Sequence, residues 1–144
     1  MKGVVIRDYI SSDFPKIMNL WEQTGLGRAN RGDNQQIIEQ SIAMGGCMFV
    51  AVYQDKLVGT SWMTFDGRRL HLHHFGVLPS FQRKGIGKML TVESLKFAKK
   101  KGYQIKLEVH QSNKPAIGLY KKFGFEFLGD YDVYIIRDVN GLNL

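Results

Sequence analysis

Apolar and polar residues follow one another along this chain in a pattern that predicts a mixed fold of strands and helices. Alternating residues, or short apolar runs between turn residues, indicate strands at 3–9, 47–53, 57–65, 70–78 and 103–110, and a closing hairpin at 125–128 and 131–137. Apolar residues at helical spacing indicate helices over 14–21 and 37–42, a third helix from Gly85 to a C-cap at Gly102, and a last helix that starts at 113–116 and stops at Gly124. The expected element order is therefore β-α-α-β-β-β-α-β-α-β-β.

The turn signals between these strands predict their directions. Gln54-Asp55-Lys56 and Asp66-Gly67 join successive strands as hairpins, which are antiparallel. The helix that starts near Gly85 forms a crossover, so the strand at 103–110 is expected to run parallel to the strand at 70–78. The expected fold class is α/β (α+β), with a mixed, mostly antiparallel sheet and flanking helices. At 144 residues, the chain is expected to be a single domain, 1–144.

The composition is that of an ordinary globular protein and limits where in the cell the protein is expected. Charged residues make up 23% of the chain, and the longest apolar run, Cys47 to Tyr53, is far too short to cross a membrane. Charge at Lys2 and Arg7 comes too early for a signal peptide, so we expect a cytoplasmic protein without a membrane partner. The single cysteine, Cys47, opens an apolar strand and is interpreted as a core residue.

The net charge of +7 suits a polyanionic ligand and would equally suit nucleic acid. The basic residues are scattered, however, and the densest run, Lys99-Lys100-Lys101, closes a helix, where cations complement the helix dipole. Nucleic acid is therefore not expected as a partner.

A glycine-containing loop between the strand that ends at Pro79 and the helix that follows predicts an anion-binding site. Gly85 and Gly87 lie at the start of that helix, where backbone N–H groups lack partners, and Arg83, Lys84 and Lys88 add positive charge. Two common phosphate motifs do not fit. The dinucleotide fingerprint needs glycine where Leu90 stands, and the P-loop needs glycine at Gln82 and Ser or Thr at Met89.

The run Gln82-Arg83-Lys84-Gly85-Ile86-Gly87 resembles the Gln/Arg-x-x-Gly-x-Gly/Ala signature of the GNAT acetyltransferase superfamily. A second signature of that family, Asn-x-x-Ala-x-x-x-Tyr followed by Gly-Phe, is similar to Asn113, Ala116, Tyr120 and Gly124-Phe125. The element order is also that of the family, so the resemblance covers nearly the whole chain. Trp21 in the first helix and the run Gly32-Asp33-Asn34 are similar to features of small bacterial members.

The resemblance implies an N-acetyltransferase that uses acetyl-CoA as a co-substrate, without a metal. The backbone of Phe75, Gly76 and Val77 is expected to pair with the pantetheine arm, with the Val77 N–H facing the thioester oxygen and Asn113 on the other side of the arm. Tyr120 is expected to protonate the departing thiolate; packing in the core is its alternative role. The implied cofactor-binding residues are Phe75, Gly76, Val77, Gln82, Arg83, Lys84, Gly85, Ile86, Gly87, Lys88, Asn113 and Tyr120.

The run His71-Leu72-His73-His74 supplies candidates for the catalytic base. Strict alternation puts His71 and His73 on one face of the strand and His74 on the other. Many family members carry a glutamate about six residues before the valine that faces the thioester, and that spacing from Val77 selects His71, with His73 as second choice. Bulk water is the alternative proton acceptor, and a zinc site on these histidines is not expected, because no clear further ligand is present.

Two functions remain open from the sequence. One is acetyl transfer to a primary amine by direct attack in a ternary complex. The other is an acyl-CoA-binding or regulatory module of the same fold that has lost transfer. The loop 25–34 either roofs the acceptor site, as in the resembled family, or is a plain surface connection. The amine stays open between a small molecule, a polyamine, a peptide N-terminus and lysine, and the oligomeric state stays open as well, with a homodimer as one option.

Overall fold

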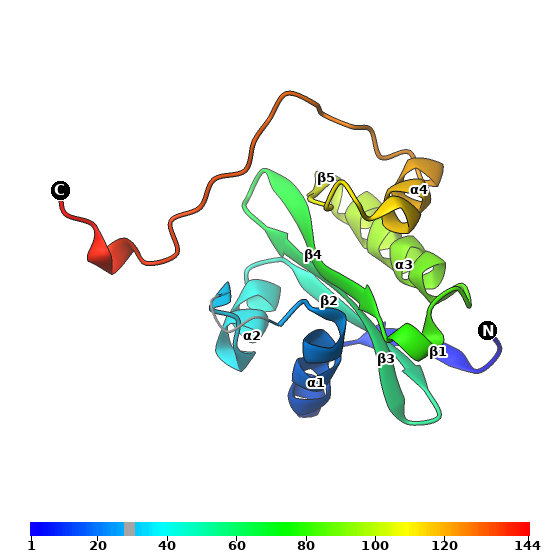
Figure 1. Cartoon of the computed structure of the whole chain (residues 1–144). Coiled ribbons are helices and arrows are strands. Elements are labelled where there is room, and N and C mark those ends of the chain that lie inside the picture. The colour runs from blue at the N-terminus through cyan, green and yellow to red at the C-terminus, as the bar shows by residue number, and fades with distance from the viewer. Residues whose placement is uncertain (28–30) are drawn as a thin grey trace. The chain divides into compact units, whose positions relative to one another are not determined.

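A computed structural model describes residues 1–27 and 31–144, which form two compact units, Met1–Glu108 and Val109–Leu144. The Met1–Glu108 unit carries a five-stranded sheet and the helices that cover it (Figure 1). The strands are β1 (Val4–Asp8), β2 (Cys47–Tyr53), β3 (Lys56–Phe65), β4 (Arg69–Val77) and β5 (Gln104–Leu107). The helices are α1 (Phe14–Thr24), α2 (Gln35–Ala43) and α3 (Ile86–Lys101) in this unit, and α4 (Lys114–Lys122) in the other.

The sheet order follows the chain order, β1-β2-β3-β4-β5. The first four strands are antiparallel, and β5 is parallel to β4. The turn signals and the crossover predict each of these directions except that of β1 against β2, which two helices separate. Gln54 and Asp55 take positive φ angles of 46° and 62° in the turn between β2 and β3, which matches the right-handed twist of a tight hairpin. The carboxylate of Asp66 accepts hydrogen bonds from the backbone N–H groups of Arg68 and Arg69 in the next turn.

Helices cover both faces of the sheet (Figure 1). Ser61 and Trp62 are neighbours on β3, so their side chains point to opposite faces. The Ser61 hydroxyl pairs with that of Ser94 on α3 at 2.7 Å, and the Trp62 indole N–H donates to the Ser41 hydroxyl on α2 at 2.8 Å. α3 therefore lies on one face, and α2 lies on the other together with α1, whose residue Trp21 is fully buried.

The second unit contains α4, which begins after Asn113 as expected. The Asn113 side chain caps the helix by accepting from the Ala116 N–H, and Gly124 follows the helix with a φ of 92°. The closing hairpin expected at 125–128 and 131–137 is not formed, since the described residues form no strand there and Phe127 and Tyr134 are 91% and 90% exposed. Alternation of apolar residues becomes a strand only where another strand completes the ladder, and the pattern alone does not supply that partner. The mixed, mostly antiparallel sheet with flanking helices is confirmed.

Candidate active site

The loop between β4 and α3 is shaped by two residues with positive φ. Arg83 has a φ of 61° and Gly85, which precedes the first residue of α3, has a φ of 83°. The Gln82 side-chain amide donates to the Val77 carbonyl at 2.9 Å and so ties the loop to the end of β4. Together these features turn the chain from the strand into the helix over the run 82–87.

The start of α3 has the properties of an anion site. No side chain within the described part of the chain caps its first turn, so its N–H groups keep their capacity to bind an anion. Arg83, Lys84 and Lys88 are exposed beside it, and Lys84 Nζ lies 5.3 Å from the centre of the Phe81 ring. The pyrophosphate of a nucleotide cofactor fits the chemistry of these groups, which supports the expectation from the sequence.

The end of β4 extends past the ladder that it forms with β5. The parallel pairing stops at Leu72 and Leu107, whereas β4 continues to Val77 and stays paired with β3 at Gly76 and Val77. The two parallel strands therefore share a ladder only over the first part of β4. This geometry is consistent with the expected role of the β4 end, where an extended ligand would lie along the strand backbone.

A β-bulge near His74 breaks the alternation expected for the four-residue histidine run. The register between β3 and β4 shifts between Thr60 and Trp62, and His74 has a φ of 42°. The His74 ring lies 4.3 Å from the Trp21 ring and 5.2 Å from the Trp62 ring, measured between centres. Placing His74 on the face opposite His73 was therefore wrong, because the extra residue of the bulge returns it to the face covered by α1 and α2.

The two candidate bases, His71 and His73, lie side by side on that same face. Their rings stack with centres 4.3 Å apart, and His73 Nε2 lies 2.8 Å from the Thr64 hydroxyl. Burial lowers the pKa of His73 to about 4, so its ring is neutral at neutral pH but a weak proton acceptor. Burial also lowers the pKa of His71, while Glu108, 3.8 Å away, acts in the opposite direction. His71, with 31% of its side chain exposed, is the more accessible of the two.

The sequence did not predict one contact between a histidine and an acidic residue in this region. His74 Nε2 lies 2.8 Å from Asp33 Oδ2, and the two side chains are only 8% and 19% exposed. Asp33 comes from the segment that leads into α2, within the loop expected at 25–34; residues 28–30 of that loop lie outside the described residues. The density of histidines at 71–74 and the acidic residue of the Gly32-Asp33-Asn34 run were the available signals. Neither signal alone indicates that His74 and Asp33 meet.

The two site residues expected in the second unit are described within it. The Asn113 side chain caps α4, as given above. Tyr120 on α4 is 7% exposed, with its ring centre 5.5 Å from that of Phe125. Burial raises the pKa of Tyr120 to about 12, so the phenol keeps its proton at any physiological pH. That state is the one required of a proton donor.

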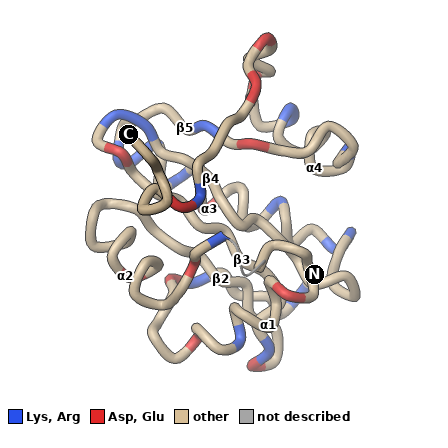
Figure 2. Tube along the Cα trace, turned by 60° about the vertical axis from the view of Figure 1, so that its left-hand side comes forward, with Lys and Arg blue, Asp and Glu red and all other residues tan. Residues whose placement is uncertain are grey.

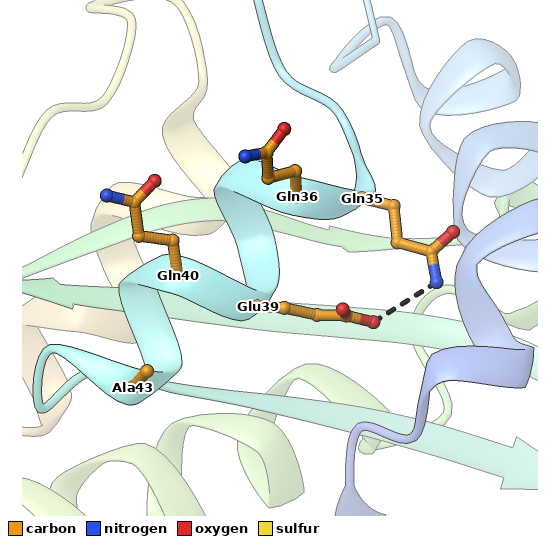
Figure 3. A pocket seen from close by; sticks show the side chains of 5 residues that line it. All are labelled: Gln35, Gln36, Glu39, Gln40 and Ala43. Atoms are coloured by element: carbon orange, nitrogen blue, oxygen red, sulfur yellow. Dashed lines mark hydrogen bonds between the residues drawn. The ribbon is translucent and has the colours of Figure 1, made fainter.

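Two hollows on the described part of the Met1–Glu108 unit contain none of the expected site residues. One hollow, of about 650 Å³, runs along α2 and is lined by Gln35, Gln36, Glu39, Gln40 and Ala43 (Figure 3). Another, of about 320 Å³, lies between α1 and the turn that joins β2 to β3. The first presents mostly side-chain amides, with Gln35 donating to Glu39 at 3.1 Å, and offers no nucleophile.

Other chemistries find little support in the described residues. Among residues 1–27 and 31–144, no group of three or more His, Cys, Asp or Glu side chains could hold a metal ion. Burial raises the pKa of the Cys47 thiol to about 12, which makes it a poor nucleophile. Lys and Arg, like Asp and Glu, lie scattered along the trace (Figure 2). Within the described segments, no helix combines the length and apolar character needed to cross a membrane.

Comparisons with known proteins agree with this geometry. The model of the acetyltransferase (GNAT) family matches residues 14–125. An acetyltransferase from Streptococcus agalactiae has a similar fold, with a TM-score of 0.77 and 20% identity over 94% of this chain and 93% of that one. AAC(6')-Iy, in complex with the bisubstrate analog CoA-S-monomethyl-acetylneamine, gives a TM-score of 0.76 and 18% identity over 94% and 99%. The ribosomal-protein-S18-alanine N-acetyltransferase from Escherichia coli gives 0.73 and 21% over 85% and 77%.

Proposed function

Because the chain belongs to the acetyltransferase (GNAT) family, we propose that it transfers the acetyl group of acetyl-CoA to a primary amine by direct attack in a ternary complex. Family membership supports acetyl transfer from acetyl-CoA in general. The amine acceptor and the ternary complex are the finer parts of the proposal. We also infer that residues 1–144 act as one acetyltransferase domain, since the matched residues 14–125 include both sequence signatures.

The observation that carries the proposal is the start of α3. An uncapped helix N-terminus follows a strand, carries Gly85 and Gly87, and is flanked by Arg83, Lys84 and Lys88. Such a site favours a dianionic or more highly charged phosphate group, because the helix dipole and the cations act in the same direction. The remaining cofactor contacts that we assign are Gln82 and Ile86 in the loop, the backbone of 75–77, and Asn113.

We assign a group of this chain to each step of acyl transfer. The amine nitrogen attacks the thioester carbonyl carbon, the carbon–sulfur bond breaks, and the thiolate leaves. We assign the Val77 N–H to the developing oxyanion and Tyr120 to the thiolate, which takes the phenolic proton. The nitrogen gives up a further proton as the amide forms, and that proton restores the phenol of Tyr120 by way of water. The acceptor arrives as an ammonium ion and loses a proton before attack, for which we assign His71, with His73 second because burial lowers its pKa to about 4.

A panel of acceptor amines tests the proposal. The protein is incubated with acetyl-CoA and, in turn, a peptide with an N-terminal alanine, neamine, spermidine and free lysine, and free thiol and the mass of the product are measured. We expect one class of amine to gain a single acetyl group with matching thiol release. If acetyl-CoA binds but no amine is acetylated, transfer is excluded and a binding module remains.

A further inference from the structure

The pair formed by Asp33 and His74 has no role in the chemistry assigned above. Its two side chains are largely buried, with Nε2 and Oδ2 2.8 Å apart, between the start of α2 and the bulge of β4. The rings of Trp21 and Trp62 lie against His74. A titratable pair therefore occupies a largely buried place beside two aromatic rings.

We expect the burial of this pair to destabilise the fold. Burying a carboxylate and an imidazole removes both from water, and an ion pair in such a place is often no better than an apolar replacement. The N–H and carboxylate are not well aligned, because Asp33 Oδ2 and both ring nitrogens of His74 lack a well-directed hydrogen bond among the described residues. The φ of 42° at His74 adds a further cost for a residue other than glycine. Costs of this kind concentrate at functional sites.

The pair links two elements that are each held firmly on their own side. Asp33 directly precedes Asn34, whose side chain caps α2 by accepting from the Ile37 N–H at 2.9 Å. On the other side, the Thr60 hydroxyl donates to the His74 carbonyl at 2.8 Å and accepts from the Trp21 indole N–H at 2.9 Å. The start of α2 therefore fixes the position of Asp33, and the bulge fixes the position of His74.

Both elements border the space that the acceptor has to enter. His71 and His73 face the side of the sheet that α1 and α2 cover, so an amine that gives a proton to either one approaches from that side. Residues 75–77, which we assign to the thioester, directly follow His74. The bulge therefore lies between the backbone of 75–77, which we assign to the acetyl donor, and the face of the sheet from which the acceptor amine approaches.

We propose that Asp33 and His74 are positioning residues, which fix the start of α2 against the β4 bulge so that the acceptor amine meets the thioester in one geometry. This inference rests on the proposed acetyl transfer. It implies that loss of the pair impairs use of the acceptor and leaves the binding of CoA unchanged, because the start of α3 is not part of the pair.

The charges around His74 define the state in which the pair acts. The groups that face its ring are Asp33 and Arg31 from the segment before α2 and His73 from β4. Burial lowers the pKa of His74, and Asp33 opposes that effect. At neutral pH a neutral imidazole therefore faces the carboxylate of Asp33, and a proton on Nε2 avoids repulsion between the Nε2 lone pair and Oδ2 at 2.8 Å.

The test compares Asp33→Asn with Asp13→Asn in the full chain. Asp13 is another buried carboxylate, paired with Arg7 at 2.8 Å, and serves as the matched control for losing such a pair. With the acceptor found in the amine panel, we expect kcat/KM for the amine to fall roughly 10- to 100-fold in Asp33→Asn, since small misplacements of reacting groups cost that much. The Kd of CoA, measured by calorimetry, should change less than about 2-fold, and Asp13→Asn should keep the parent kcat/KM.

Equal kcat/KM in Asp33→Asn and the parent, or an equal fall in Asp13→Asn, would overturn the inference. His74→Asn is the second variant, because asparagine tolerates positive φ, and it should reproduce the effect of Asp33→Asn. The ¹⁵N resonances of the imidazole report the tautomer without any acceptor. We expect an Nε2–H tautomer for His74 in the parent and a mixture in Asp33→Asn; the same spectrum in both excludes the pairing. If the parent acetylates no amine, the proposed function fails, whereas this spectrum still tests the pair.

Discussion

The burial of Tyr120 is compatible with the chemical role that we propose for it. Its phenol has a pKa raised to about 12 by burial, so it carries a proton throughout the working pH range. A thiolate is a stronger base than water and takes a proton from a positioned donor, even one with a high pKa, when the two meet in the transition state. Packing and proton donation are therefore compatible at this position.

Replacing Tyr120 with phenylalanine separates these roles. The ring is kept and the proton is lost, so we expect thioester turnover to fall roughly 100-fold while the Kd of CoA changes little. Steady-state kinetics with thiol detection, together with calorimetry, measure the two quantities. An unchanged turnover number would leave Tyr120 with packing alone.

Gly76 shows a steric requirement that the sequence does not reveal. A Cβ atom at this position would lie 2.7 Å from Leu26 Cδ1 and 3.5 Å from Thr24 Oγ1. We expect Gly76→Ala to lower the free energy of unfolding by about 1 kcal/mol, the small end of overpacking, because the end of the Leu26 side chain can move. Urea unfolding of Gly76→Ala, Leu26→Ala and the double variant measures the coupling. The alanine should cost less in the Leu26→Ala background; an equal cost in both backgrounds would contradict the contact.

At the scale of elements, β4 holds most of the candidate chemistry and also a local difference between expectation and structure, the bulge at His74. The hairpin turns, the crossover and the glycines at both ends of α3 could be predicted, because each depends on neighbouring residues. The bulge at His74 could not, since it arises from the packing of Trp21 and Trp62 and the bond from Thr60, which are distant in sequence. The pairing of His74 with Asp33 was hidden for the same reason. The roles of 75–77, 82–88, Asn113 and Tyr120 stay predictions.

The histidines of β4 predict a fall in stability at mildly acid pH. Burial lowers the pKa of His73 to about 4 from 6.5, and the pKa values of His71 and His74 are lowered as well. Below about pH 6.5 the unfolded chain therefore binds more protons than the folded chain. The stability that the neutral histidines contribute is complete above about pH 6.5 and is lost as the pH falls towards 4. At about pH 5.5 we expect the lowered pKa of His73 to reduce the free energy of unfolding by about 1 kcal/mol.

Urea unfolding at about pH 7.5 and pH 5.5 measures this dependence. His73→Asn should show a smaller difference between the two pH values than the parent. His110→Asn, which changes an exposed histidine, is the control and should keep the parent difference. A parent protein equally stable at both pH values would argue against buried neutral histidines on β4.

At the scale of the whole molecule, the net charge of +7 and the start of α3 together predict strong binding of a polyanion. We expect acetyl-CoA at about 100 times its Kd to stabilise the protein by about 2.7 kcal/mol, which raises Tm by roughly 10 °C for a chain of this size. Gly87→Asp should abolish the shift, because a carboxylate at the helix start repels phosphate.

Thermal unfolding with and without acetyl-CoA measures the shift in Tm. Gln36→Asp, an exposed position on α2, makes the same change in charge and should retain the shift. A full shift in Gly87→Asp would show that the phosphates bind elsewhere. The parent shift should also shrink with added salt, since exposed charges are screened.

The order of the strands has a consequence for how the protein is made. Each strand pairs with the strand before it in the chain, so no strand has to be inserted between two that are already joined. As the polypeptide leaves the ribosome, the hairpins β2–β3 and β3–β4 can close quickly, because each joins strands separated by a short turn. The parallel addition of β5 has to wait for the whole of α3 to be synthesised. The pairing of β1 with β2 closes a longer connection still, because α1 and α2 both lie between these strands, so these two steps carry the largest loop-closure costs in the sheet.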